Sequence, residues 1–164
     1  SMSREVLRAI LKGDIEKFDG FIQQGIVVNE VTEKERWNYL HRALMSIAKP
    51  PVLEMVQHLI ACGVDVNAID VYGNNSLHYA MKLKDANIVR VLLDAKVDVN
   101  HVNDEGVSPL REALLTKPYD YSSIQLLLEH GADVEQKVEG GISVKEFSAT
   151  VANEDATLMD LFNK

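Results

Sequence analysis

Histidine, cysteine and carboxylate side chains are the groups in this sequence that could carry chemistry, as bases, nucleophiles or metal ligands. The chain has one cysteine, Cys62, which could act as a nucleophile if neighbouring groups lowered the pKa of its thiol. No other local feature of the sequence supports that role. A single cysteine cannot form an internal disulfide, so we expect Cys62 to be a free thiol in a reducing compartment.

Three histidines, His58, His101 and His130, are scattered along the chain and form no pair at the spacing of a metal site. His130 is expected near a helix end, where a cation interacts favourably with the helix dipole. The sequence contains no phosphate-binding Gly-rich loop, no Gly-x-Ser-x-Gly and no His-Glu-x-x-His, and Gly140-Gly141 is expected to form a turn. We therefore predict no catalytic residue, no cofactor and no metal, and do not expect an enzyme.

The elements that would position these groups are indicated by an internal repeat. A five-residue phrase occurs at Gly63–Asn67, Lys96–Asn100 and Gly131–Glu135, and in degraded form at Gly25–Asn29. A second phrase, upstream of it, occurs at Asn38–Ala43, Asn75–Ala80 and Ser108–Ala113, with a weaker copy at Ser143–Ser148. The shortest period, from Asn67 to Asn100, is 100 − 67 = 33 residues.

A 33-residue period with these two phrases resembles the ankyrin repeat. The resemblance covers nearly the whole chain and implies an all-α fold class, an ankyrin-repeat solenoid of about five helix-turn-helix repeats joined by β-turn or hairpin fingers. The implied single domain spans residues 1–164. It divides into an N-terminal cap at 4–29, repeats at 30–68, 69–101 and 102–136, and a C-terminal cap at 137–164.

The third repeat shows why the repeats must stack. Asn75 or Ser76 is expected to cap a first helix, and the apolar residues of the two helices form stripes that neither helix can bury alone. These stripes contain Leu77, Ala80, Met81, Ile88, Val89, Leu92 and Leu93. Stacked neighbours would bury them in one continuous core.

Residues that recur once per repeat are predicted to be framework. Asp65, Asp98 and Asp133 are expected to bond the backbone of the following turn. His41 and His78 occupy the Leu-His position of the family, where the imidazole bonds backbone groups and braces the turn, and Arg111 replaces them in the fourth repeat.

The turns and connections between helices show where the chain departs from the pattern. Gly73 and Gly106 are expected in turns that need a positive φ. The second repeat lacks a turn glycine, so its finger is expected to have an unusual shape. Extra residues around Ala48–Val52 and Lys117–Tyr121, with prolines, are expected in lengthened loops.

The positions that the repeat does not fix are the candidate partner-binding residues. They are expected at the finger tips and on the exposed side of the first helices, which line the concave groove in this family. By offset they are Arg36, Trp37, Met45, Ser46, Val71, Tyr72, Asn74, Lys82, Leu83, Asp104, Glu105, Val107, Leu115 and Thr116. For Trp37 and Tyr72 the alternative is packing onto a neighbouring finger, and Tyr119 with Tyr121 offers a second possible contact surface.

Charge and hydropathy narrow the class of partner. The chain has 17 basic and 25 acidic residues and a net charge of −8. It has no Lys/Arg cluster that could track a phosphate backbone or an anionic membrane surface, and no apolar run that could span a bilayer. We therefore expect neither nucleic acid nor a membrane as a partner. The expected function is non-enzymatic binding of another protein with a basic surface, by a monomer, in the cytoplasm because no signal peptide is evident.

Two narrower interpretations stay open. The chain could be a small bacterial immunity or inhibitor protein that neutralises a toxin or nuclease. It could also be an ankyrin segment excised from a larger signalling or effector protein.

Overall fold

The computed structural model describes residues 2–46, 48–137, 141–151 and 154–164, so Gly140 of the expected last turn lies outside the described residues. These residues form ten short helices and no named strand, which confirms the all-helical solenoid. The helices are α1 (Arg4–Lys12), α2 (Ile15–Gln23), α3 (Tyr39–Leu44), α4 (Leu53–Ala61), α5 (Ser76–Leu83), α6 (Ala86–Asp94), α7 (Pro109–Ala113), α8 (Tyr121–Glu129), α9 (Val144–Val151) and α10 (Ala156–Phe162).

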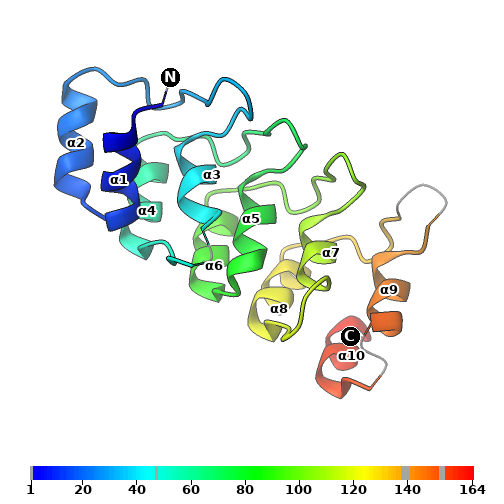
Figure 1. Cartoon of the computed structure of the whole chain (residues 1–164). Coiled ribbons are helices and arrows are strands. Elements are labelled where there is room, and N and C mark those ends of the chain that lie inside the picture. The colour runs from blue at the N-terminus through cyan, green and yellow to red at the C-terminus, as the bar shows by residue number, and fades with distance from the viewer. Residues whose placement is uncertain (1, 47, 138–140, 152–153) are drawn as a thin grey trace.

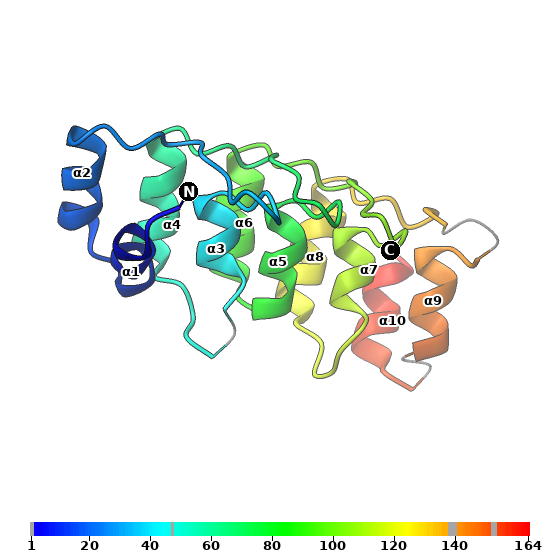
Figure 2. The same cartoon turned by 45° about the horizontal axis from the view of Figure 1, so that its top comes forward.

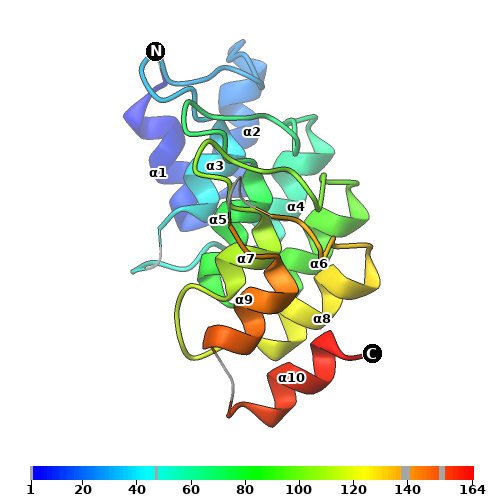
Figure 3. The same cartoon turned by 90° about the vertical axis from the view of Figure 1, so that its right-hand side faces the viewer.

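The helices pair in chain order and the pairs stack side by side from the N-terminus to the C-terminus (Figure 1). The first helices of the pairs form one row and the second helices form another, as Figure 2 shows. In keeping with this, α3 packs against α1 and α5, and α6 packs against α4 and α8. The view along the stack separates the rows, with α5 and α7 to one side and α6 and α8 to the other (Figure 3).

Local sequence explains where the helices begin and what they bury. Asn75 caps α5, and its side chain accepts hydrogen bonds from the backbone N–H groups of Leu77 and His78. The α6 helix is capped by Asp85 in the same way. The apolar residues predicted for this repeat are all buried and belong to one hydrophobic core that runs through the stack.

The fingers are the connections that precede α3, α5 and α7, and we call them finger two (30–37), finger three (69–74) and finger four (102–107). Within finger three, Asp70 N donates to Asn74 O at 3.0 Å. Between fingers, Val71 N donates to Glu35 O and Asp104 N donates to Tyr72 O, each at 3.0 Å. These bonds join consecutive fingers into a row along one edge of the molecule (Figure 1).

A positive φ occurs at the turn of each of these fingers. Gly73 and Gly106 adopt φ values of 82° and 79°, as predicted. In finger two the position is taken by Arg36, with φ of 60°, a conformation that is costly for a residue with a Cβ. The missing glycine of the second repeat is therefore replaced by a strained arginine.

A side-chain bracket explains the recurrence of the five-residue phrase. Asn67 Nδ2 donates to Lys96 O at 3.2 Å, and its Oδ1 accepts from Asp98 N at 2.7 Å, so one amide holds the phrase of the next repeat. Asn29 and Asn100 make the same two bonds to their own next repeats. The predicted aspartate role is confirmed as well, since Asp65, Asp98 and Asp133 each accept from the backbone N–H two residues on.

The lengthened connections lie at the end of the helices opposite the fingers (Figure 2). One joins α3 to α4 and contains Pro50 and Pro51, and the other joins α7 to α8 and contains Pro118, so both predicted loops are confirmed. At the C-terminus, Leu158 and Phe162 of α10 are buried and cover the last part of the core. In the described residues we find no helix with the length and apolarity that a bilayer crossing demands.

Candidate partner-binding surface

Two buried histidines fasten the first helices to the adjacent backbone. His78 Nδ1 accepts from Asn75 N at 3.1 Å, and its Nε2 lies 2.9 Å from Val107 O, so the proton must be on Nε2. His41 makes the matching bonds to Asn38 N and Ala68 O. The framework role predicted for the Leu-His position is confirmed.

Burial decides the charge of these rings. Loss of solvent lowers the pKa of His78 to about 4 and also lowers the pKa of His41, although nearby Asp70 opposes the shift in both. Both imidazoles are therefore neutral at pH 7. A neutral, fully bonded ring is part of the scaffold and is not poised as an acid or base.

Arg111 replaces the histidine in α7 and, like the histidines, bonds a backbone carbonyl further along the chain. Its Nη2 donates to Ile142 O at 2.7 Å, and its guanidinium lies over the ring of Phe147 in α9 at 5.0 Å from the centroid. The arginine thus connects α7 to Ile142, just before α9, and to α9 itself.

Asp70 is the polar centre of finger three. Its Oδ1 accepts from the backbone N–H groups of Tyr72 and Asn74, each at 2.9 Å, and its Oδ2 accepts from the Tyr79 hydroxyl. Trp37 Nε1 donates to the same Oδ2 at 3.1 Å from finger two. Burial, with the hydrogen bond to Asp70 as the second cause, raises the pKa of Tyr79 to about 12. Trp37 is therefore held by the framework.

The predicted partner-binding residues divide by exposure. The exposed ones are Arg36, Val71, Tyr72, Lys82, Asp104, Glu105, Leu115 and Thr116. The partly buried ones are Trp37, Met45, Ser46, Asn74, Leu83 and Val107. Asn74 is bound on both sides, because its Oδ1 accepts from Asn103 Nδ2 at 2.9 Å and its Nδ2 lies near the Tyr79 hydroxyl.

Exposed apolar surface is concentrated on finger three. Ile69, Val71 and Tyr72 are 37%, 42% and 52% exposed, and they lie within four residues of one another in the chain. Leu115, at 48%, is the other strongly exposed apolar residue among the candidates. Apolar groups that the core does not use are what a partner could cover.

The candidates fall into two groups at opposite ends of the first helices. Val71, Tyr72, Asp104 and Glu105 lie in the fingers, before α5 and α7 begin, whereas Lys82 and Leu115 lie at or beyond the ends of these helices. A helix of eight residues such as α5 is about 12 Å long. One partner could contact both groups only by lying along the first helices.

Charge is distributed unevenly over the surface. Asp104 and Glu105 are exposed at the tip of finger four. At the N-terminal cap, Arg4, Arg8 and Lys12 of α1 line a hollow together with Lys49 from the first lengthened loop. This local group of basic residues was not predicted from the sequence, although a spacing of four places the three residues of α1 on one face of a helix.

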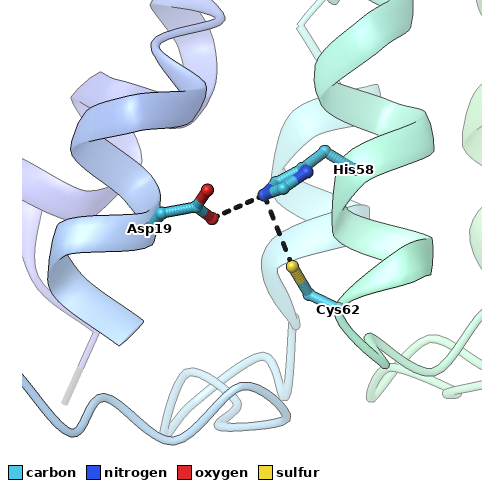
Figure 4. A group of neighbouring side chains, drawn as sticks. All are labelled: Asp19, His58 and Cys62. Atoms are coloured by element: carbon cyan, nitrogen blue, oxygen red, sulfur yellow. Dashed lines mark hydrogen bonds and ion pairs between the residues drawn. The ribbon is translucent and has the colours of Figure 1, made fainter. Parts of the chain in front are cut away.

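A second unexpected group lies between the first two helix pairs. His58 and Cys62 are one helical turn apart on α4 and its C-cap, and Asp19 faces them from α2 (Figure 4). His58 Nε2 lies 2.6 Å from Asp19 Oδ1 and 3.5 Å from Cys62 Sγ. The group was not predicted from the sequence, in which His58 and Cys62 were each considered alone. The spacing of four between them was the available signal.

This group does not have the arrangement of a Cys-His-Asp triad. In a triad the imidazole is the base, and its two nitrogens serve different partners, the nucleophile on one side and the orienting carboxylate on the other. Here Asp19 and Cys62 both meet the same nitrogen of His58. Burial and the charge of Asp19 raise the pKa of the Cys62 thiol, which disfavours the thiolate nucleophile.

Known proteins match this chain over its repeated part. A family model described as ankyrin repeats, three copies, matches residues 40–138, more than half of the chain. A putative ankyrin repeat protein of Acanthamoeba polyphaga mimivirus, L91, is 36% identical over 125 residues, which are 68% of this chain and 19% of that protein.

Other relatives are also much longer than the matched segment. A putative ankyrin repeat protein of fowlpox virus, FPV219, is 35% identical over 54% of this chain and 20% of its own length. The Arabidopsis thaliana E3 ubiquitin-protein ligase KEG is 36% identical over 60% of this chain and 6% of its own length. The stacked helix pairs, the finger row and the matched family model together show that this chain belongs to the ankyrin-repeat family.

Proposed function

We propose that this chain is a non-enzymatic module that binds a partner protein through its fingers and first helices. Ankyrin repeats are a generic protein-interaction unit, which supports the class of function. The single observation that carries the proposal is the exposure of Tyr72, Val71 and Ile69 together on finger three. These side chains project from a turn whose backbone is already fixed by Asp70 and Gly73, so the fold itself does not require them to be apolar.

The contact is expected to centre on finger three and extend to finger four. Asp104 N donates to Tyr72 O, so the tips of the two fingers are adjacent and rigidly joined. An exposed aromatic ring beside the exposed carboxylates of Asp104 and Glu105 suits a partner that offers an apolar pocket rimmed by basic side chains. The net charge of −8 would speed the encounter with such a partner.

The remaining predicted residues have graded roles in this proposal. Arg36, Lys82 and Leu115 are exposed and available, whereas Met45 and Leu83 are partly buried against the core and would contribute only at the margin of a contact. Trp37 and Asn74 would act by holding the fingers in place. We expect the module to act as a monomer in the cytoplasm, without nucleic acid, membrane or cofactor.

Neutralisation of a basic toxin or nuclease is a narrower form of the same proposal. It would use the same acidic and aromatic finger surface, and it predicts that the partner is an enzyme that loses activity in the complex. The alternative of a segment from a larger signalling or effector protein would use the surface to hold that protein to its target. This alternative is supported by the relatives, because the segment that matches this chain is a small part of each of them.

The proposal is tested by quantitative affinity capture from native cell extract with four baits. They are the unaltered chain, Tyr72→Ala with Val71→Ala, Tyr121→Ala, and Val27→Ala. Tyr121 lies at the start of α8 and tests the second contact surface. Val27, which is 66% exposed, is a control for the removal of an exposed apolar group away from finger three.

A protein retained by every bait except the finger-three variant would support the proposal. If retention is lost only with Tyr121→Ala, the contact lies on the second surface, around Tyr119 and Tyr121, and not on finger three. Equal retention by all four baits would overturn the finger-three contact.

A further inference from the structure

Three side chains from neighbouring helix pairs converge on one point at the surface, away from the fingers. His58 and Cys62 come from α4 and its C-cap, and Asp19 comes from α2 (Figure 4). One ligand-type atom from each, an imidazole nitrogen, a thiol sulfur and a carboxylate oxygen, lies within 4.8 Å of the other two. The arrangement is independent of the proposed protein-binding surface.

The carboxylate and the thiol compete for one nitrogen of His58. His58 Nε2 carries at most one proton. If that proton is donated to Asp19 Oδ1 at 2.6 Å, the nitrogen has no lone pair with which to accept from Cys62 at 3.5 Å. If the thiol donates to the nitrogen, the carboxylate loses its donor. A cation at the centre would instead accept a lone pair from all three atoms, with the thiol proton of Cys62 released to solvent.

We propose that Asp19, His58 and Cys62 form a site for a divalent cation of the Zn²⁺ class. A thiolate and an imidazole select Zn²⁺ or a similar transition metal, whereas Mg²⁺ and Ca²⁺ prefer sites made of oxygen atoms. Three protein ligands leave a fourth tetrahedral position for water.

The three ligand atoms lie within 4.8 Å of one another, and two of their separations can be compared with those of such a site. With bonds to zinc of ordinary length, the nitrogen and oxygen ligands should be about 3.3 Å apart and the nitrogen and sulfur about 3.6 Å apart. The sulfur already lies 3.5 Å from the nitrogen. The carboxylate oxygen of Asp19, now 2.6 Å from the nitrogen, must move away by about 0.7 Å. Rotation of the Asp19 side chain, which is 45% exposed, allows this movement.

Neighbouring groups favour ion entry and fix the imidazole. The side chains of His58 and Asp19 are 25% and 45% exposed, so an ion can reach them without opening the core. The buried ring of Phe18 meets the His58 ring edge-on, with centroids 6.2 Å apart, and limits its rotation. The bound ion would join the N-terminal cap to the second repeat and so strengthen the coupling between neighbours.

Titration of the reduced chain with Co²⁺ alone tests the site, because cobalt reports thiolate ligation and tetrahedral geometry in its absorption spectrum. The unaltered chain should develop a thiolate-to-cobalt charge-transfer band and intense visible bands. Added Zn²⁺ should displace the Co²⁺ and abolish these bands. Cys62→Ser should lose the charge-transfer band and bind at least about tenfold more weakly. His130→Gln, which removes an exposed histidine elsewhere, should leave the spectrum unchanged.

Thermal unfolding gives a second readout in the same samples. Zn²⁺ at a hundredfold excess over its dissociation constant should raise the midpoint of the unaltered chain by about 5–10 °C and that of Cys62→Ser far less. Cys62→Ser keeps the His58–Asp19 contact, so it should fold, and helical content in the far ultraviolet verifies this. Absence of the thiolate band in the unaltered chain, or an equal Zn²⁺ response in both proteins, would overturn the site.

Discussion

Trp37 and Asp70 are joined across two fingers by a hydrogen bond of 3.1 Å from the indole Nε1 to the carboxylate Oδ2. The carboxylate is buried and also accepts from Tyr79 and from two backbone N–H groups of finger three. Loss of one donor to a buried carboxylate has a cost in stability. The finger that presents Tyr72 therefore depends on a residue of the finger before it.

The first prediction concerns this bond. Trp37→Phe keeps an aromatic ring and removes the indole donor, so it should lower the free energy of unfolding by about 1–2 kcal/mol, mostly through the weakened pairing of Asp70. Urea denaturation at pH 7 measures the change. Tyr72→Phe is the matched control and should change stability by less than about 0.5 kcal/mol, because the Tyr72 side chain is half exposed. Equal stability of Trp37→Phe and the unaltered chain would show that the bond is not a structural one.

The second prediction concerns pH and His78. Its pKa is depressed to about 4 by burial, with Val107 O and Asp70 opposing the shift and His101 and Lys82 adding to it. The unfolded chain, with an ordinary histidine pKa, then binds a proton more readily than the folded chain. The contribution of a neutral His78 is fully present above about pH 6.5 and is lost as the pH falls toward 4, by about 2 kcal/mol at pH 5.

Chemical denaturation at a series of pH values gives the test for His78. His78→Gln should be less stable than the unaltered chain at pH 7 and should lose less of its stability between pH 7 and pH 5. A parallel decline of the two proteins would assign the acid sensitivity to other groups.

The third prediction concerns the strained turn of finger two. Arg36 has a φ of 60°, a conformation that glycine adopts without steric cost. Arg36→Gly should therefore raise the free energy of unfolding by up to about 1 kcal/mol. Lys34→Gly is a control in the same finger at an exposed residue without a positive φ, and it should lower stability by about 0.5–1 kcal/mol. A loss of stability in both variants would mean that the Arg36 side chain stabilises the finger by more than the strain it causes.

The fourth prediction concerns the C-terminal cap. Leu158 of α10 is fully buried, and its truncation to alanine should destabilise the cap by about 2–4 kcal/mol. Because each repeat contacts only its neighbours, the damage should stay local. Hydrogen exchange should quicken at the amides of α9 and α10 and stay unchanged in α1 to α4. Faster exchange along the whole chain would show that the repeats unfold as a single unit.

The framework residues could be predicted because the same residue types recur at the same offsets in successive repeats, where they meet the same backbone groups. Asp65 and its counterparts, and His41 with His78, appear at fixed offsets, and the structure gives each the hydrogen bonds that its position implied. The positive φ of Gly73 and Gly106 followed from the same regularity.

Contacts that occur only once in the chain could not be predicted in this way. The approach of Asp19 to His58 depends on how the irregular N-terminal cap stacks on the second repeat, where the spacing of the phrases differs from 33 residues. The bond from Trp37 to Asp70 depends on the unusual shape of finger two. The basic hollow on α1 needed Lys49, which a lengthened loop brings to the helix.

The fifth prediction bears on the central claim, that finger three carries the contact with a partner protein. The purified captured partner is titrated with each variant in a calorimeter. The dissociation constant for Tyr72→Ala should be at least about thirtyfold larger than for the unaltered chain, the loss of affinity typical of an aromatic hot spot. Val27→Ala should bind as the unaltered chain does, and both variants should unfold at the unaltered midpoint. Equal affinity of Tyr72→Ala and the unaltered chain, with its stability intact, would contradict the account.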